Sequence, residues 1–405
     1  MLRKIICLTL TAALLLLSGC AKNETSGSEM KTLAEIRAEK ENVSELAEKC
    51  PNLNLTNTYF YVPEVDKLGG FTVDLTAPVE EREKLLFDTA EWLVGGTPDE
   101  SELYYWNSRE FKRIPYAECK DDPNRADYFS IDYRSDKIDM GIELWGSIYF
   151  IFKDYEDVPM TDTGNYNWIF SVQDTPVKKY DLIAGENADE VFELQGGEIS
   201  VKDAVEIMKS ELEISPFHLD GLKLHPKQAS VYKLGGKYAV NTVFYYEYNG
   251  VLLDHHYYST NLETDEYDFI KDYLTEDTSM ARNDRIDQLF YARLGKFKPT
   301  DESFDKFISL ERFLSMMSEK LTGNSRFTID SVELLYGVER IYPEGFEAIT
   351  KDEKVATHPS GLRSRPIWVA YLSQTGIQDA KQMCVWADAL TGELKLYYGQ
   401  EASEH

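Results

Sequence analysis

The chain has 405 residues with 43% hydrophobic and 13% aromatic side chains, so it is long enough for two or three folded domains. Its formal net charge is −28. This acidic excess argues against nucleic acid as a partner, because a protein that binds phosphates must neutralise them with lysine and arginine. It also argues against electrostatic attachment to anionic lipids, but it is compatible with basic partners or divalent cations.

The first 20 residues have the order of parts found in a bacterial lipoprotein signal. Arg3 and Lys4 precede an apolar run of roughly 13 residues that ends in Leu17-Ser18-Gly19-Cys20. That four-residue motif resembles a lipobox, in which the preceding peptide is removed and the new N-terminal cysteine carries acyl chains. The run is too short for a membrane-spanning helix, which needs about 20 apolar residues. We therefore predict lipidation of Cys20 and a lipid anchor on the extracytoplasmic face of the cell membrane.

The other cysteines predict no disulfide framework. Cys7 leaves with the signal, which leaves Cys50, Cys119 and Cys384 besides Cys20. Three remaining thiols allow at most one intramolecular disulfide, and their spacing fits no zinc site. We favour the interpretation of three dispersed, buried thiols.

Beyond a polar tether, the pattern predicts an α+β N-terminal region. Residues 31–49 have apolar side chains at helical spacing, and 58–62 and 71–75 have the composition of strands. A second helix is predicted over 78–94, with proline near its start and glycine just past its end. Four further strand-like runs follow, over 127–133, 138–144, 147–152 and 167–172.

An internal repeat appears when the chain is compared with itself at an offset of about 110 residues. From Val201 and from Leu310, apolar side chains recur three, four, seven and eleven residues later. This spacing forms one face of a helix in each copy. Ser200 and Ser309 stand where each helix needs its N-cap.

Strand patterns follow each of these helices. In the first copy two strands flank Asn249-Gly250, which is a strong hairpin signal. We predict an α+β fold, with the N-terminal region followed by two repeats of a helix packed on a small antiparallel sheet. The predicted boundaries are 1–19 for the signal peptide, 20–30 for a flexible tether, 31–190 for the N-terminal domain, 196–275 and 305–400 for the repeats, and 276–304 for a linker.

The second copy ends in Asp388-Ala389-Leu390-Thr391-Gly392-Glu393. Together with the order of helix and sheet, this motif resembles the PepSY module and the related repeats of YycH/YycI-type regulatory proteins, over about 198–260 and 306–399. The resemblance implies a turn at the motif and an extracytoplasmic binding or regulatory role, as a partner of membrane kinases or of secreted peptidases. The chain departs from YycH/YycI-type proteins in having a lipobox where they have a spanning helix.

Asp254-His255-His256 in the predicted hairpin is the strongest candidate for metal or acid–base chemistry. A two-residue turn would set Phe244 opposite His255 and Val243 opposite His256. Adjacent strand residues point to opposite faces, so the two histidines do not readily bind one ion. We favour a structural role, because a metal site needs several convergent ligands.

One face of the same hairpin is a candidate binding surface. Tyr245, Glu247, His256 and Tyr258 share this face. Exposed tyrosines offer a large rigid area that can stack on sugars or grip peptides. Strands also prefer aromatic residues, so a purely structural interpretation stays open.

No GxSxG, HExxH or GxGxxG motif occurs. The acidic stretch 263–277 lacks the glycine of a calcium loop, and a solvated linker is the favoured interpretation. We therefore predict no enzyme activity, no catalytic residues, and neither metal nor other cofactor. The predicted function is non-catalytic binding or regulation of a protein or peptide outside the membrane. The alternatives are a carbohydrate- or solute-binding lipoprotein and a hydrolase, whose paired carboxylates leave little trace in a sequence.

Overall fold

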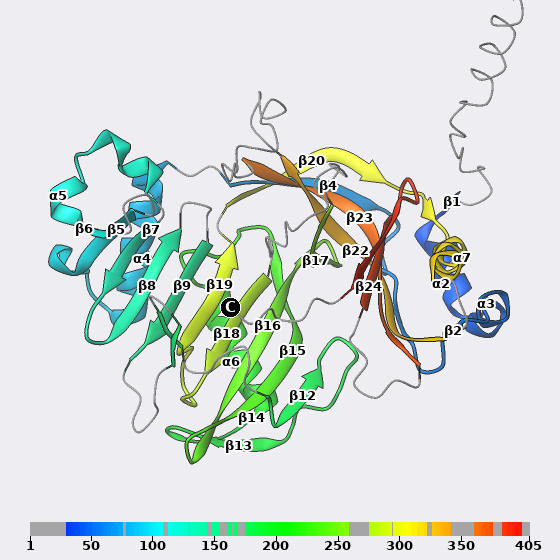
Figure 1. Cartoon of the computed structure of the whole chain (residues 1–405), viewed down its shortest axis with the longest axis horizontal. Coiled ribbons are helices and arrows are strands. Elements are labelled where there is room, and N and C mark those ends of the chain that lie inside the picture. The colour runs from blue at the N-terminus through cyan, green and yellow to red at the C-terminus, as the bar shows by residue number, and fades with distance from the viewer. Residues whose placement is uncertain are drawn as a thin grey trace, which may run out of the picture.

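The computed structural model describes residues 30–75, 78–107, 112–128, 130–143, 147–153, 161–163, 166–168, 175–258, 275–293, 295–321, 326–341, 360–375 and 383–398. Strands hold about half of these residues, and 19 strands belong to one hydrogen-bonded network. The predicted α+β fold with two separate small sheets is therefore wrong. The protein is mostly β, and its network bends into two parts, named here the first sheet and the second sheet (Figure 1).

The first sheet combines strands of the N-terminal region with strands of the first predicted repeat. All of its neighbours are antiparallel. In spatial order the strands are β12 (Lys178–Asp181), β15 (Lys223–Leu234), β16 (Lys237–Tyr248), β18 (Thr275–Met280), β19 (Gln288–Arg293), β9 (Ser147–Phe152), β8 (Ile138–Glu143), β7 (Ser130–Arg134), β5 (Leu103–Asn107) and β6 (Lys112–Pro115). Because β19 pairs with β9, the two predicted units share one continuous sheet.

The second sheet is completed by segments from the start of the chain. Its antiparallel centre is, in spatial order, β25 (Leu394–Tyr398), β24 (Met383–Asp388), β23 (Gly361–Gln374) and β22 (Phe327–Ile341). Two short strands, β2 (Leu53–Asn54) and β3 (Tyr59–Tyr61), run parallel to the first half of β22. Strand β4 (Leu68–Asp74) pairs with the start of β23 and with β20 (Lys296–Phe304).

Strand β17 (Val251–Tyr258) joins the two sheets. Asn249 and Gly250 have φ values of 51° and 81°, which confirms the predicted two-residue turn before it. After two paired positions beside β16, β17 leaves the first sheet and runs parallel to β22, where Tyr258 lies opposite Glu339. The turn was therefore predictable from the sequence, but the partner of the returning strand was not.

Strand β18 takes the place beside β16 that β17 leaves open. The predicted pairs of Phe244 with His255 and of Val243 with His256 are therefore wrong, and Phe244 lies opposite Glu276 instead. The predicted linker over 276–304 contains most of β18 and all of β19 and β20. At its C-terminal end the acidic stretch is thus part of the sheet, not a solvated linker.

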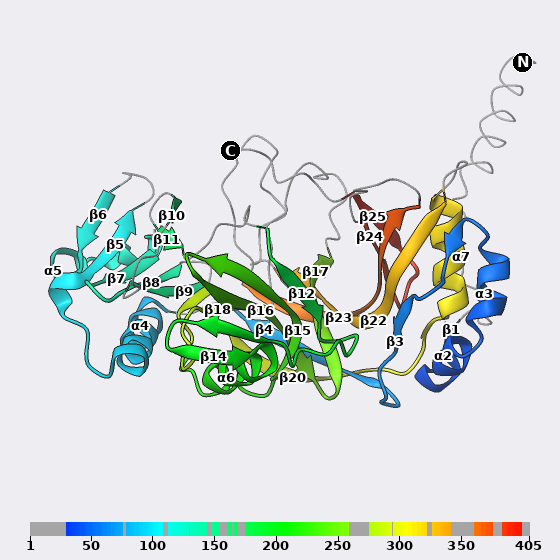
Figure 2. The same cartoon turned by 90° about the horizontal axis from the view of Figure 1, so that it is seen from below.

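The main helices lie on the outer side of the bend (Figure 2). Helices α4 (Val79–Val94) and α6 (Val201–Glu213) pack on the first sheet, and α7 (Leu310–Lys320) packs on the second, with α2 (Leu33–Lys40) and α3 (Val43–Lys49) beside it. A short helix, α5 (Tyr116–Cys119), and two 3-10 turns, η1 (Glu100–Glu102) and η2 (Pro123–Asp127), lie near β5 and β6. The remaining strands form pairs: β1 (Met30–Lys31) with β21 (Phe307–Ile308), β10 (Thr161–Thr163) with β11 (Tyr166–Trp168), and β13 (Val191–Leu194) with β14 (Gly197–Ser200).

The predicted helical faces and serine caps of α6 and α7 are confirmed. The side chains of Ser200 and Ser309 each accept a hydrogen bond from the backbone N–H three residues later. The apolar residues of both predicted faces are buried. Phe313 of α7 stacks on Trp368 of β23, with ring centroids 5.6 Å apart. Local spacing therefore identified both helices and the sides that they bury.

The six-residue motif 388–393 forms the turn between β24 and β25. Asp388 is fully buried, and its Oδ1 accepts the N–H groups of Leu390 and Thr391 at 2.8 and 2.7 Å. Its Oδ2 accepts Arg365 Nε at 2.5 Å. Asp287 likewise accepts two backbone N–H groups, in the turn between β18 and β19. In both turns, a buried aspartate supplies acceptors that the backbone otherwise lacks.

An aromatic cluster fills the bend between the sheets. The ring of Phe71 on β4 lies 5.4 Å from Tyr248, 5.3 Å from Phe297 and 5.3 Å from Tyr336. These partners belong to β16, β20 and β22, so rings from both sheets meet at one residue. The Tyr336 hydroxyl donates to the carbonyl of Gly69 at 2.7 Å, which satisfies its polar end. One hydrophobic core therefore extends through both sheets.

We predict that Phe71→Ala lowers the free energy of unfolding by about 3 to 5 kcal/mol, because it leaves a cavity where four rings meet. Urea denaturation followed by intrinsic fluorescence measures this loss. Phe192→Ala is the matched control, since Phe192 is half-buried on the β13–β14 hairpin and away from the bend. Equal losses in the two variants would contradict a special role for the cluster.

Candidate functional site

The four predicted binding residues lie around the crossing of β17. Tyr245 and Glu247 are on β16, whereas His256 and Tyr258 are on β17, which has left β16 for β22. Tyr245 is only 4% exposed, so its ring is not part of an open aromatic row. The side chains of His256 and Tyr258 lie outside the described part of the structure, as does Cys20.

Glu247 is half-buried and faces a residue of its own sheet. Its Oε2 lies 3.8 Å from His225 Nδ1 on β15. Burial lowers the pKa of His225, and the nearby Glu247 carboxylate opposes that shift. The described partner of Glu247 is thus a residue on the neighbouring strand.

Tyr245 belongs to a mixed aromatic and ionic cluster between the two sheets. Lys227 lies where the register of β15 against β16 shifts, and its Nζ is 3.5 Å from Glu333 Oε1 on β22. The same Nζ is 5.2 Å from the ring centroid of Tyr245 and 5.8 Å from that of Tyr371 on β23. We name Lys227, Tyr245, Glu333 and Tyr371 the seam cluster. One lysine connects the sheets through an ion pair and two cation–π contacts.

The buried end of the seam cluster is Glu333, whose side chain is 2% exposed. Ser331 Oγ donates to its Oε1 at 2.7 Å, and its Oε2 is buried without a hydrogen-bond partner among the described residues. A buried carboxylate that loses its cation is strongly destabilising. Sequence analysis missed Lys227, although the preceding Pro226 was a signal, since proline inside a strand marks a bulge or an edge.

We predict that Lys227→Met lowers the free energy of unfolding by about 3 kcal/mol, because Glu333 is left buried and unpaired. Glu333→Gln in the same chain should recover part of that loss, since it removes the uncompensated charge. A double-mutant cycle by chemical denaturation measures the coupling, which we expect to be about 1 kcal/mol or more. Strictly additive effects of the two substitutions would rule the coupling out.

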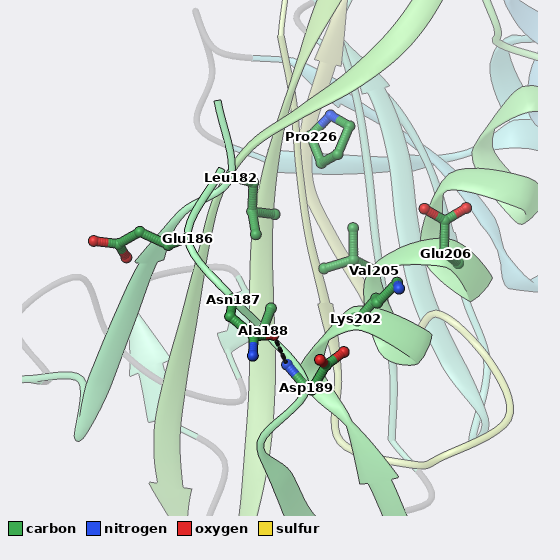
Figure 3. A pocket seen from close by; sticks show the side chains of 9 residues that line it. All are labelled: Leu182, Glu186, Asn187, Ala188, Asp189, Lys202, Val205, Glu206 and Pro226. Atoms are coloured by element: carbon green, nitrogen blue, oxygen red, sulfur yellow. Dashed lines mark hydrogen bonds between the residues drawn. The ribbon is translucent and has the colours of Figure 1, made fainter. Parts of the chain in front are cut away.

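A shallow pocket of about 270 Å³ lies beside the first sheet, between α6, the connection that follows β12, and β15 (Figure 3). Apolar side chains of Leu182, Val205 and Pro226 approach it from three different elements. The residues that line it are Leu182, Glu186, Asn187, Ala188, Asp189, Lys202, Val205, Glu206 and Pro226. None of them was predicted as a site residue, because their proximity depends on how α6 docks on the sheet.

Backbone hydrogen bonds preform one wall of this pocket. The N–H groups of Val201 and Lys202 donate to the carbonyls of Glu190 and Ala188 at 3.0 and 2.9 Å. These bonds satisfy the first free N–H groups of α6 with the segment that borders the pocket. The wall is therefore held by the start of the helix.

The rim of the pocket is acidic. Glu186, Asp189 and Glu206 are exposed, against one exposed cation, Lys202. In the described ranges neither Asp189 nor Glu206 forms an ion pair. Apolar side chains beside exposed carboxylates suit a long aliphatic chain that ends in a positive charge.

The described residues offer neither a metal-binding cluster nor a membrane-spanning helix. Within the described ranges, no group of three or more His, Cys, Asp or Glu side chains is placed to hold a metal ion. In that part of the chain, no helix is both long and apolar enough to cross a membrane. Cys50, Cys119 and Cys384 are buried in three separate parts of the fold, as the interpretation of dispersed thiols expects.

Comparison with known proteins gives no functional relative. No family profile matches the chain, and no curated protein matches it significantly. Among solved structures, it is similar to an uncharacterized protein from Eubacterium rectale, with a TM-score of 0.43 and 14% sequence identity. That similarity covers 85% of this chain and 90% of the other.

Proposed function

We propose that this chain is a membrane-anchored, extracytoplasmic lipoprotein that binds a protein or peptide partner and catalyses no reaction. The pocket beside α6 is the observation that carries the binding role. Its apolar lining and acidic rim favour a basic side chain of the partner, lysine or arginine. The motif that ends in Cys20 supports the membrane anchor.

Electrostatic attraction favours a basic partner both at long range and in the pocket. The net charge of −28 attracts a basic molecule from a distance and raises its rate of association. At the pocket, Leu182, Val205 and Pro226 would contact the aliphatic stem of the partner's side chain. Asp189 and Glu206 would face its charged end. Because the pocket is shallow, further contacts around it must supply much of the affinity.

The position of β1 favours access to this pocket. Strand β1 pairs with β21 beside α2 and α7, at the end of the molecule opposite α5 (Figure 1). The nine residues between Cys20 and β1 span at most about 30 Å when fully extended. A lipid on Cys20 would thus hold the α2–α7 end near the membrane, with the pocket of the first sheet further along the molecule.

We predict that Cys20→Ala releases the protein from the membrane fraction, because no acyl chain can then be attached. Fractionation of the cells that make the protein, followed by immunoblotting, measures its distribution. Cys7→Ala is the matched control and should stay with the membrane, since Cys7 lies inside the apolar run and not in the lipobox. Continued membrane attachment of Cys20→Ala would refute the anchor.

We predict that the double variant Asp189→Asn, Glu206→Gln loses at least about tenfold in capture of the partner, since two charged contacts are removed. Proximity crosslinking in the native cells, with quantitative mass spectrometry of the captured neighbours, measures this loss. The matched control is Asp136→Asn, Glu118→Gln, which removes the same charge from exposed positions near β7 and α5.

Loss of one neighbour from the pocket variant but not from the control would support the proposal. Equal capture by both variants would refute the role of the pocket. If transporters or glycans replace a protein partner among the neighbours, the carbohydrate- or solute-binding alternative would be favoured.

A further inference from the structure

A buried carboxyl group lies under the C-terminal end of α6. Glu276 on β18 is fully buried, and the Tyr246 hydroxyl on β16 donates to its Oε1. Its Oε2 is buried and has no hydrogen-bond partner among the described residues. An ionised carboxylate with one oxygen unpaired in such a place is costly, whereas a protonated carboxyl is not.

The groups around this carboxyl do not compensate a negative charge. Helix α6 presents Glu213, a like charge, and β16 presents Tyr246, which is neutral. The connection after α6 presents His218, whose ring centroid lies 6.1 Å from that of Tyr246. On the other side, the described pairing of β18 with β19 comes closest to Glu276 at Asp277, which lies opposite Tyr291. No described lysine or arginine acts on Glu276 from these elements.

His218 is half-buried and lies beside Tyr246. Its Nε2 lies 3.2 Å from the carbonyl oxygen of Leu222, which can only accept, so Nε2 carries the hydrogen. Its Nδ1 is buried without a partner in the described part of the chain.

We propose that Glu276, protonated and held by Tyr246, is a latch that fixes the C-terminal end of α6 to the first sheet and releases it on losing its proton. Two observations place the latch on α6. Helix α6 packs against β18, and its last residue, Glu213, is a like charge that acts on Glu276. One turn earlier, Glu211 Oε2 accepts the N–H of Ile286 at 2.7 Å, so this end of α6 holds the sheet by a second carboxyl.

The direction of the pH dependence follows from burial. Burial raises the pKa of Glu276 from 4.5 to about 8 in the closed structure, and exposure to water on opening would return it towards 4.5. Below pH 4.5 both forms are protonated and the latch has its full strength. Between pH 4.5 and 8 only the closed form keeps the proton, so opening becomes about tenfold more favourable per pH unit. The loss ends as pH rises through the closed-state pKa.

Hydrogen exchange of the intact protein tests the latch. Between pH 5.5 and 7.5, after correction for intrinsic exchange, protection of the peptide 201–219 should fall about a hundredfold. In Glu276→Gln this protection should not change between the two pH values. Glutamine is neutral at both and still accepts a hydrogen bond from the Tyr246 hydroxyl. Glu198→Gln, at an exposed position on β14, is the matched control and should behave as the unchanged chain does.

The proposal would be overturned if protection in the unchanged chain stayed constant between pH 5.5 and 7.5. It would also be overturned if protection fell equally in Glu276→Gln. Infrared spectroscopy of the unchanged chain gives a second readout, and one variant then assigns the band. At pH 6.5 the carbonyl band of a protonated carboxyl should be present in the unchanged chain, and Tyr246→Phe should shift it because a hydrogen bond is lost. Absence of such a band would also overturn the latch.

Discussion

The crossing of β17 from β16 to β22 is the constraint on which the rest of the fold depends. Backbone N–H and carbonyl groups in a sheet must be paired, and β17 pairs with β16 at only two positions before it turns to β22. The edge of β16 that it leaves is taken by β18, β18 brings β19, and β19 pairs with β9. One strand that changes partner therefore merges the N-terminal region with the first repeat, and both with the second. The rings around Phe71 fill the bend that this change creates.

The continuous sheet buries several acidic side chains, and the fold stabilises them in three ways. Asp287 and Asp388 accept backbone N–H groups and an arginine, which disperses their charge in two turns. Glu333 has Lys227 of the opposite sheet, so its charge stabilises the arrangement of the two sheets. Glu276 has only a tyrosine hydroxyl, and for it the proton takes the place of a cation. The first two arrangements supply donors and cations to the carboxylates, whereas the third depends on a proton.

Sequence reasoning succeeded where the information is local. The spacing from Val201 and Leu310, the serine caps and the Asn249-Gly250 turn depend on residues within a dozen positions, and all of them are confirmed. It failed where a strand chooses its partner, because the alternation of β17 fits β16 and β22 equally well. Every consequence of that choice was therefore lost, including the burial of Tyr245 and the inclusion of Glu276 in the sheet. The pocket was missed for the same reason, since Leu182, Val205 and Pro226 meet only through tertiary packing.

Helix α6 connects the pocket with the region around Glu276. Its first half supplies Lys202, Val205 and Glu206 to the pocket, and its second half supplies the contacts to β18 and the β18–β19 turn. A helix of 13 residues behaves as a stiff rod, so a change in how one end is held alters the position of the other. The backbone bonds from Val201 and Lys202 tie its start to the segment that borders the pocket, and that start is the natural pivot. The same helix thus borders the pocket with its first half and covers the strand of the buried carboxyl group with its second half.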